Sequence, residues 1–306
     1  MIGYIVRRLL WGVGVLAGVV VVSFVLIYLA PADPARIIAG PHATPEVLAA
    51  IRHGYGLDQP LPVQFGVYLG KLLHGDLGAS ILYSEDVTQV LKDRGPFTLE
   101  LAVAGLLVEL VVGIPLGVAA ALRHTTIVDR AAVVLALFGL STPSFWLGSV
   151  LFSLFAVHWQ IFSADGSTGL RALALPAVTL GLAGAAWYTR LIRSSMLDVL
   201  GSDYIRTARA KGLPWTTVVR KHALRNAITP VVTQIGLDMG YFLGGVVVVE
   251  SVLGWPGLGQ AAASAIDADD PNLIMGTVLV GAVAVVLANL AVDLCYALID
   301  PRVGLL

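Results

Sequence analysis

Long apolar stretches recur along the chain, separated by shorter segments in which glycine, proline and charged residues gather. A helix that crosses the hydrocarbon core of a bilayer needs roughly 20 mostly apolar residues. Six stretches meet this requirement: residues 9–29, 99–122, 131–157, 173–192, 228–249 and 273–298. The pattern therefore predicts an all-α polytopic membrane protein with six transmembrane helices.

The first apolar stretch has the general form of a secretory signal. It follows Arg7 and Arg8, and Ala30-Pro31-Ala32 loosely resembles a small-residue cleavage site. Its apolar core of roughly 20 residues is longer than the roughly 7–15 residues of a signal peptide. We therefore expect residues 1–30 to be retained as the first transmembrane helix.

The distribution of Lys and Arg predicts the orientation, because cytoplasmic loops carry an excess of these residues. With the N-terminus inside, thirteen of the 19 basic residues lie on the cytoplasmic side. Five of the remaining six belong to one long outer loop, and long loops count weakly in this rule. An even number of spans then returns the C-terminus to the same side, so the predicted topology is N-in and C-in.

Composition supports a membrane protein and argues against other classes. The 306 residues are 57% hydrophobic and 13% charged, with a mean hydropathy of +0.85, whereas a soluble domain carries roughly 25% charged residues. The net charge of −1 says nothing by itself about a nucleic-acid or acidic partner, and we expect no nucleic-acid partner. Cys295 is the single cysteine, so an intrachain disulfide cannot form.

The chain lacks the residue patterns of catalysis. No Gly-x-x-x-x-Gly-Lys-[Ser/Thr] phosphate loop, no Gly-x-Ser-x-Gly nucleophile elbow and no Cys/His spacing typical of a metal site occurs in the sequence. We therefore expect neither a catalytic site nor a metal or cofactor in this chain, which is not expected to be an enzyme.

Three segments interrupt the apolar pattern. Residues 31–97 form a long outer segment whose amphipathic stretches, Pro45–Arg52 and Leu61–Leu73, predict a small helical cap. The basic segment 193–230 is the long cytoplasmic one, and residues 251–272 form a glycine-rich outer loop. This organisation divides the chain into a first helix at 1–30, an outer helical segment at 31–97 and a five-helix core at 98–306.

The basic segment predicts two short helices joined by a turn. Asp203 is a candidate N-cap, Ala208 favours a helix, and Gly212 suits a C-terminal stop. Pro214 then stands where a second helix begins, running on to Asn226. A rigid pair of this kind can insert into a groove of a partner and transmit a rigid-body movement. On composition alone, a basic anchor for anionic lipid explains the segment equally well.

The basic segment resembles the coupling segment of the permease subunits of ABC importers. The family's pattern is Glu-Ala-Ala, three residues, Gly, then Ile and Pro, and the matching residues here are Arg206-Thr207-Ala208, Gly212, Ile228 and Pro230. The Arg and the long distance from Gly212 to Pro230 depart from the general pattern. Both departures are typical of the dipeptide, oligopeptide and nickel permeases.

Other motifs of that branch occur in the expected order. They are Tyr55-Gly56-Leu57-Asp58-Gln59-Pro60, Gly75-Asp76-Leu77-Gly78, Ser141-Thr142-Pro143-Ser144-Phe145-Trp146, Trp255-Pro256-Gly257-Leu258-Gly259 and Asp300-Pro301-Arg302. The resemblance covers nearly the whole chain, and the long segment after the first span is typical of the first of the two permease subunits. The resemblance implies a type I ABC importer permease fold in the inner membrane of a prokaryote.

The resemblance also implies partners. A second homologous permease completes the translocation path, two ATPase subunits or domains bind ATP and Mg, and an extracytoplasmic binding protein delivers a peptide or similar solute. The residues that it assigns to ATPase coupling are Asp203, Tyr204, Arg206, Thr207, Ala208, Arg209, Lys211, Gly212, His222, Arg225 and Asn226. Arg209, Lys211 and Arg225 can also contact lipid headgroups. An ion-coupled secondary transporter is the alternative, although the chain lacks the internal repeats expected of one.

Ionisable residues within the spans are candidates for the translocation path, because a charge at membrane depth is costly. They are Glu109, Asp238 and Asp293, with Glu250 nearer the outer boundary. Such acids can accept the ammonium end of a peptide; the alternative is a hydrogen-bonded contact between helices.

Other residues in the spans predict local features. Gly113, Pro115 and Gly117 predict either a bend or close packing in the second span, and Pro143 predicts the same in the third span. Packing is the favoured explanation. Trp159 and Trp255 are predicted at the outer interface.

Overall fold

The computed structural model describes residues 2–29, 34–39, 43–54, 56–162, 169–244 and 246–299. Ala30-Pro31-Ala32, Tyr55 and Asp300-Pro301-Arg302 lie outside these residues, as do the side chains of Asp293 and Cys295. The described part is helical except for turns and an isolated bridge between Ala79 and Asp86.

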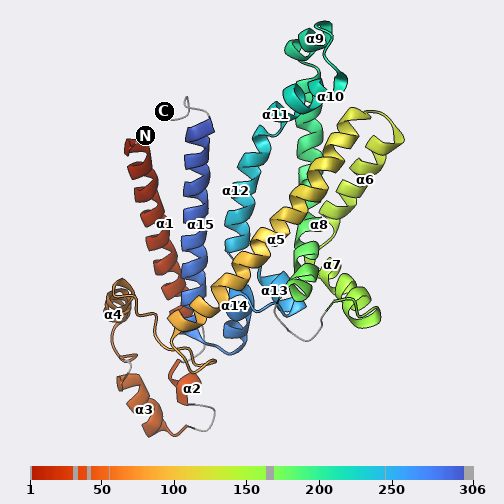
Figure 1. Ribbon diagram of the computed structural model, residues 1–306. Coiled ribbons are helices and arrows are strands. Elements are labelled where there is room, and N and C mark those ends of the chain that lie inside the picture. The colour runs from red at the N-terminus through yellow and green to blue at the C-terminus, as the bar shows by residue number, and fades with distance from the viewer. Residues whose placement is uncertain are drawn as a thin grey trace.

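The two outermost helices of the sequence lie side by side. Helix α1 (Ile2–Leu29) packs along α15 (Pro271–Ile299), and the two helices approach closely where Gly12 faces Val286. Figure 1 places the start of α1 and the end of α15 at the same end of the bundle. The short helices α2 (Pro34–Ala39), α3 (Pro45–Gly54) and α4 (Leu61–Leu73) lie at the opposite end, as a helical cap predicts.

The centre of the fold is the pair α5 (Val87–Leu122) and α8 (Leu170–Leu200), which pack together along most of their length. A Cβ at Gly113 would lie 2.6 Å from the Cβ of Tyr188, and one at Gly117 would lie 2.7 Å from the carbonyl oxygen of Thr189. The small residues therefore bring two helix backbones together. Helix α5 continues through Pro96 and Pro115, so these prolines do not end it, and the packing interpretation of Gly113 and Gly117 agrees with the structure.

Within the part of the chain that the structure describes, four helices are long and apolar enough to cross a membrane: α1, α5, α8 and α15. Two bent pairs bring the number to six if each pair forms one span, which is the predicted number. The first pair is α6 (Ile127–Ser141) with α7 (Ser144–Leu151) and its π-helical continuation η1 (Phe152–His158). The second is α12 (Thr229–Leu243) with α13 (Val247–Leu253).

The predicted third span, residues 131–157, is bent at Pro143, as that proline predicts. The chain turns by 100° between α6 and α7. Pro143 precedes α7, and proline both removes a backbone donor and restricts the residue before it, so a helix ends there readily. The predicted fifth span, 228–249, was too long as one helix, because α12 ends at Leu243 next to Gly244.

Other boundaries moved outward from the predicted ones. Helix α5 begins at Val87, so it runs through the predicted boundary between the outer segment 31–97 and the core. The predicted outer loop 251–272 contains the end of α13 and a further helix, α14 (Leu258–Asp267). Hydropathy detects only the part of a helix that is apolar, and these extensions carry polar residues.

Candidate functional site

The basic segment forms the tip of the molecule at the end opposite α3, as Figure 1 shows. Helix α9 (Asp203–Ala210) is followed by a turn at Gly212, whose φ is +76°, and then by one helical run. This run consists of α10 (Trp215–Thr217), the π-helical η2 (Val218–Ala223) and α11 (Leu224–Ala227). The predicted arrangement of two helices around Gly212 is confirmed, and we call residues 203–227 the coupling segment.

One side of the coupling segment is anchored in the protein core. Ile205 and Ala208 of α9 are buried, as are Val218, Val219 and Ala223 of the second helix. These side chains belong to the same apolar cluster as Ile192 and Met196 near the end of α8. Because buried apolar side chains pack closely, the coupling segment and the end of α8 form one packed unit.

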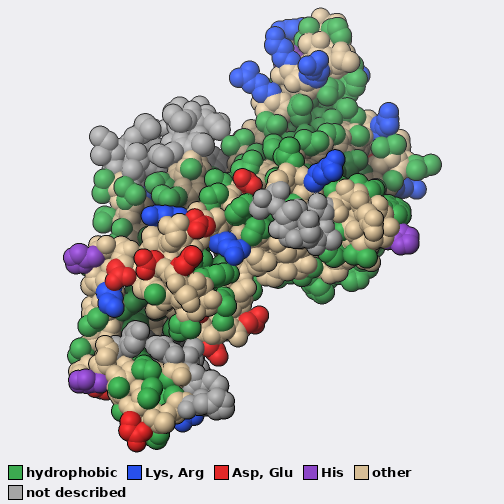
Figure 2. Space-filling model, turned by 60° about the horizontal axis from the view of Figure 1, so that its bottom comes forward, with side chains coloured by type: hydrophobic (Ala, Val, Ile, Leu, Met, Phe, Trp, Pro, Cys, Tyr) green, Lys and Arg blue, Asp and Glu red, His purple; other side chains and the backbone are tan. Residues whose placement is uncertain are grey.

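The other side of the coupling segment carries exposed basic and aromatic side chains. The guanidinium of Arg209 lies 5.2 Å from the ring centre of Trp215, which places a cation over an aromatic face across the glycine turn. Asn226 donates from Nδ2 to the hydroxyl of Tyr204 at 2.9 Å and to the carbonyl of His222 at 3.1 Å. Figure 2 shows basic side chains grouped at this tip and acidic ones over the opposite end.

The structure places most predicted coupling residues on this exposed surface. Arg206 pairs with Asp203 one turn earlier, and both side chains are exposed. Ser202, not Asp203, occupies the N-cap position of α9, so the predicted cap was wrong by one residue. Thr207, Lys211 and Arg225 are exposed and His222 is half-buried, whereas Ala208 is buried on the inner face of α9. Trp215 was not among the predicted coupling residues; its position directly after Gly212 and Pro214 was the available signal.

A charged cluster joins α8 to the turn between α5 and α6. Arg193 donates from Nε to Asp129 Oδ1 at 2.5 Å and from Nη2 to Oδ2 at 3.0 Å. The same carboxylate accepts the backbone N–H of Thr125 at 2.9 Å and lies 3.0 Å from Nδ1 of His124. Asp129 is buried, and none of these residues was predicted as a site, because Asp129 and Arg193 are 64 positions apart.

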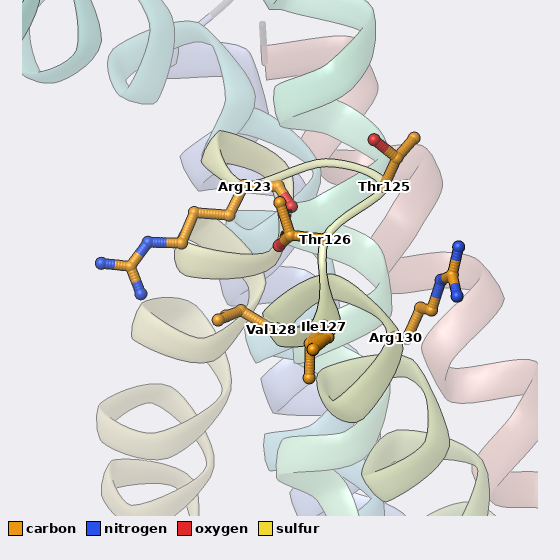
Figure 3. Close-up of a pocket in the computed structure, with 6 residues that line it drawn as sticks. All are labelled: Arg123, Thr125, Thr126, Ile127, Val128 and Arg130. Atoms are coloured by element: carbon orange, nitrogen blue, oxygen red, sulfur yellow. Dashed lines mark hydrogen bonds between the residues drawn. The ribbon is translucent and has the colours of Figure 1, made fainter.

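The surface beside this cluster is hollowed but holds no converging ligands. Its lining residues are Arg123, Thr125, Thr126, Ile127, Val128 and Arg130. Figure 3 shows the guanidinium groups of Arg123 and Arg130 pointing away from each other, on opposite sides of the turn. Two cations that diverge cannot bind one anion together, so this hollow is not a candidate ligand site.

A second polar cluster lies between α5, α8 and α12, away from the ends of α5 and α8. The Tyr188 hydroxyl donates to Asp238 Oδ2 at 2.5 Å, and Gln234 donates from Nε2 to Asp238 Oδ1 at 2.8 Å. Glu109 is buried on α5 against Gly184, and its Oε2 has no hydrogen-bond partner among the described atoms. The structure therefore brings two of the predicted path residues into one neighbourhood.

Glu250 is placed differently from the other path candidates. Its side chain is fully buried; Oε1 accepts the Thr98 hydroxyl at 2.8 Å and Oε2 accepts the Gln260 N–H at 3.0 Å. Thr98 in turn accepts the backbone N–H of Leu258 at 2.8 Å. Both oxygens of Glu250 therefore hold the segment between α13 and α14 against α5, which assigns this residue a structural role.

Trp255 belongs to the same region and corrects a prediction. It was expected at the lipid interface, but only 2% of it is exposed, and its indole N–H donates to the carbonyl of Phe97 at 2.8 Å. An indole can be buried when its N–H finds an acceptor. Trp159 is exposed. No group of three or more potential metal-ligating side chains occurs among the described residues.

Together, these features define the class: a polytopic helical membrane protein with a basic helix pair projecting from one end. Comparison with known protein families identifies the family of the chain. Residues 113–305 match the model of the binding-protein-dependent transport system inner membrane component, and residues 1–102 match the N-terminal model of the same system's membrane component.

Relatives with assigned names match over nearly the whole chain. The glutathione transport system permease protein GsiC of Salmonella choleraesuis is 42% identical over 303 residues, covering 99% of both chains. The probable D,D-dipeptide transport system permease protein DdpB of Escherichia coli is 42% identical over 330 aligned positions, covering 98% of this chain and 97% of the relative.

The chain belongs to the family of binding-protein-dependent transport system inner membrane components, as a permease of the ABC peptide-importer type. It is a multi-pass inner-membrane protein and a transport subunit, not itself an enzyme.

Proposed function

We propose that the chain is one of two permease subunits that form the translocation path of an ABC importer for short peptides. ATP hydrolysis takes place on separate subunits, which bind the coupling segment at the cytoplasmic face. An extracytoplasmic binding protein delivers the solute at the α3 end. The start of α1 and the end of α15 lie at the opposite end (Figure 1), in the cytoplasm.

The observation that carries this proposal is the two-sided construction of the coupling segment. Its small apolar face is buried against α8, while Tyr204, Arg209 and Trp215 stand on the opposite, exposed face. An exposed aromatic and arginine surface is typical of residues that anchor a protein–protein interface. Because the buried face is continuous with α8, a push on the exposed face moves a transmembrane helix.

The substrate class rests on the relatives. Glutathione and D,D-dipeptides are the solutes in the names of two permeases 42% identical to this chain over nearly their full lengths. Both are short peptides with a free ammonium group and free carboxylates. We therefore propose a short peptide with a free amino group as the transported solute, and we place its path along the open face that includes Asp238.

Co-purification tests the assembly. The chain is expressed with its candidate ATPase subunits, and an affinity tag on the chain recovers the complex from detergent. We expect ATPase subunits to co-purify with the wild type, and the double variant Arg209→Ala, Trp215→Ala to lose them. Control variants on the far side of the molecule, such as Lys71→Ala on α4, should keep them.

The opposite result points to another class of transporter. If the chain alone, without ATPase subunits, moves solute across proteoliposomes in response to an ion gradient, it is a secondary transporter and the proposal fails.

A further inference from the structure

The polar cluster between α5, α8 and α12 contains two carboxyl groups and no matching cation. Asp238 accepts two hydrogen bonds from neutral donors, Tyr188 and Gln234, and Glu109 packs against Gly184, one helical turn before Tyr188 on α8. The sequence contains no Lys or Arg between Arg94 and Arg123, between Arg171 and Arg190, or between Arg225 and Arg302. On α8 the nearest basic residue, Arg190, lies two positions after Tyr188, but its side chain is exposed and not buried with the cluster.

Glu109 shows where a positive group is missing. It is 2% exposed, and its Oε2 has no partner among the described atoms. An unpartnered polar atom in a buried site costs roughly 1–3 kcal/mol, and more for a charged group. Gly184 makes room for the carboxyl, because a side chain there would collide with it. Two carboxyls at this depth require a proton or a cation to offset their charge.

Asp238 is the accessible member of the pair. It is half-buried, and its neighbours on α12, Leu237 and Tyr241, are exposed in the single chain. A path that runs between two permeases passes along such an open face. A solute can reach Asp238 from this face, while the charge of Glu109 acts from behind it.

The hydrogen bond from Tyr188 to Asp238 also joins the two helices that flank the coupling segment, α8 and α12. Tyr188 lies on α8, which leads into the coupling segment, and Asp238 lies on α12, which leads out of it. An ammonium group is a stronger donor to a carboxylate than a phenol is, because its hydrogen bonds are charge-assisted. A solute ammonium that replaces the phenol on Asp238 therefore releases α8 from α12 at this point.

We propose that Asp238 and Glu109 form a subsite for the primary ammonium group of the transported peptide, and that this group displaces the Tyr188 hydroxyl from Asp238. Binding of a solute at this subsite thereby changes the contact between α8 and α12, the two helices that carry the coupling segment. This inference rests on the proposed function for the identity of the solute, but the binding of an ammonium group can be tested without transport.

The test is protection of the carboxyls from dicyclohexylcarbodiimide in membranes that contain the full complex. Mass spectrometry measures labelling of the peptides that carry Asp238 and Glu109. Glycinamide is the probe, and propionamide, which has a methyl in place of the ammonium, is the neutral control; KCl keeps the ionic strength constant. We expect glycinamide to slow labelling of Asp238 and propionamide to have no effect.

Two variants separate a binding role from a structural one. Tyr188→Phe removes the competing donor, so glycinamide should protect Asp238 at about fivefold lower concentration, the equivalent of one neutral hydrogen bond. Glu109→Gln removes the second charge and should raise the protecting concentration about tenfold, as expected for a charge-assisted interaction. A merely structural cluster gives no such opposite shifts. Both variants should keep the wild-type elution volume.

Several results would overturn the inference. They are equal protection by glycinamide and propionamide, no labelling of Asp238 under any condition, and labelling that KCl alone suppresses. ATP-driven peptide import without glycinamide protection would sink the subsite and leave the proposed function standing. Protection by glycinamide without ATP-driven import would support the subsite and contradict the proposed function.

Discussion

Arg193 of α8 binds Asp129 of α6 through both carboxylate oxygens, at 2.5 Å from Nε and 3.0 Å from Nη2. Arg193 lies ten positions before Asp203, the first residue of α9. The Asp129 carboxylate also accepts the N–H of Thr125, whose φ is +68°. One buried carboxylate thus joins α8, α6 and the turn before α6 near the base of the coupling segment. A movement of α8 at this level must carry the turn with it.

Loss of the charge at Asp129 should destabilise the protein. Asp129→Asn leaves the half-buried Arg193 guanidinium without its buried counter-charge, and breaking such a pair costs about 3 kcal/mol. We expect the free energy of unfolding in detergent to fall by about that amount. Arg190→Ala, on the exposed side of the same helix, is the matched control and should change it little. Equal stability of both variants would contradict the importance of the pair.

The turn at Gly212 should be specific to glycine. Gly212 has a φ of +76° and open space around its Cα, so Gly212→Ala costs about 1 kcal/mol of backbone strain and creates no clash. Gly212→Pro is incompatible with that φ and also removes the N–H that donates to the Arg209 carbonyl at 2.9 Å. We expect Gly212→Pro to insert into the membrane normally and to abolish substrate-stimulated ATP hydrolysis by the assembled complex.

Gly201 supplies the control for that experiment. Its φ is −78°, and a Cβ there would meet only carbonyl oxygens at 3.6 and 3.7 Å, so Gly201→Ala should keep the stimulation. Unchanged stimulation in Gly212→Pro would argue against a coupling role for the segment.

The close approach of α5 and α8 should depend on Gly113. Gly113→Ala places a methyl 2.6 Å from Tyr188 Cβ and 2.8 Å from the Ala185 carbonyl oxygen, so the helices must move apart. Overpacking of this kind costs about 1–3 kcal/mol. Gly95 lies in the same helix with no atom within 4 Å of its added Cβ. Gly95→Ala should therefore stabilise the helix by about 0.5–1 kcal/mol. Thermal unfolding of the two variants should shift in opposite directions.

The hydrogen bonds around Glu250 should hold the segment between α13 and α14. Thr98→Val removes the hydroxyl that donates to Glu250 and accepts from Leu258, and a broken buried bond costs about 1–3 kcal/mol. We expect faster hydrogen exchange at the amides of Leu258 and Gln260, measured by mass spectrometry after digestion. The Thr277 hydroxyl bonds only within its own helix, so Thr277→Val should leave that exchange unchanged; equal exchange in both variants would refute the role of Thr98.

Much of the fold and of the coupling segment could be predicted from the sequence. Apolar length locates α1, α5, α8 and α15 because a bilayer demands a fixed length of hydrocarbon-compatible helix. The turn at Gly212 was predictable because a left-handed conformation strongly favours glycine. The bend at Pro143 was also predictable, because proline weakens a helix even where the apolar pattern continues on both sides of it.

The clusters that involve long-range contacts could not be predicted. Glu109, Asp238 and Glu250 look alike in the sequence, as acids in apolar stretches. Only folding distinguishes them: Glu250 meets Thr98 and the Gln260 amide, while Glu109 is left with an oxygen that has no partner among the described atoms. The burial of Trp255 depends in the same way on a carbonyl 158 positions away, at Phe97.

Apolar length and glycine turns are local properties of the chain, so the residue pattern alone shows that this protein resides in a membrane and that a basic helix pair interrupts its spans. Only the tertiary structure shows which face of that pair is exposed and which carboxylates have hydrogen-bond partners. It also shows that Arg193 joins α8 to α6. Those properties depend on distances between residues far apart in the chain, and only the packing of the helices sets these distances.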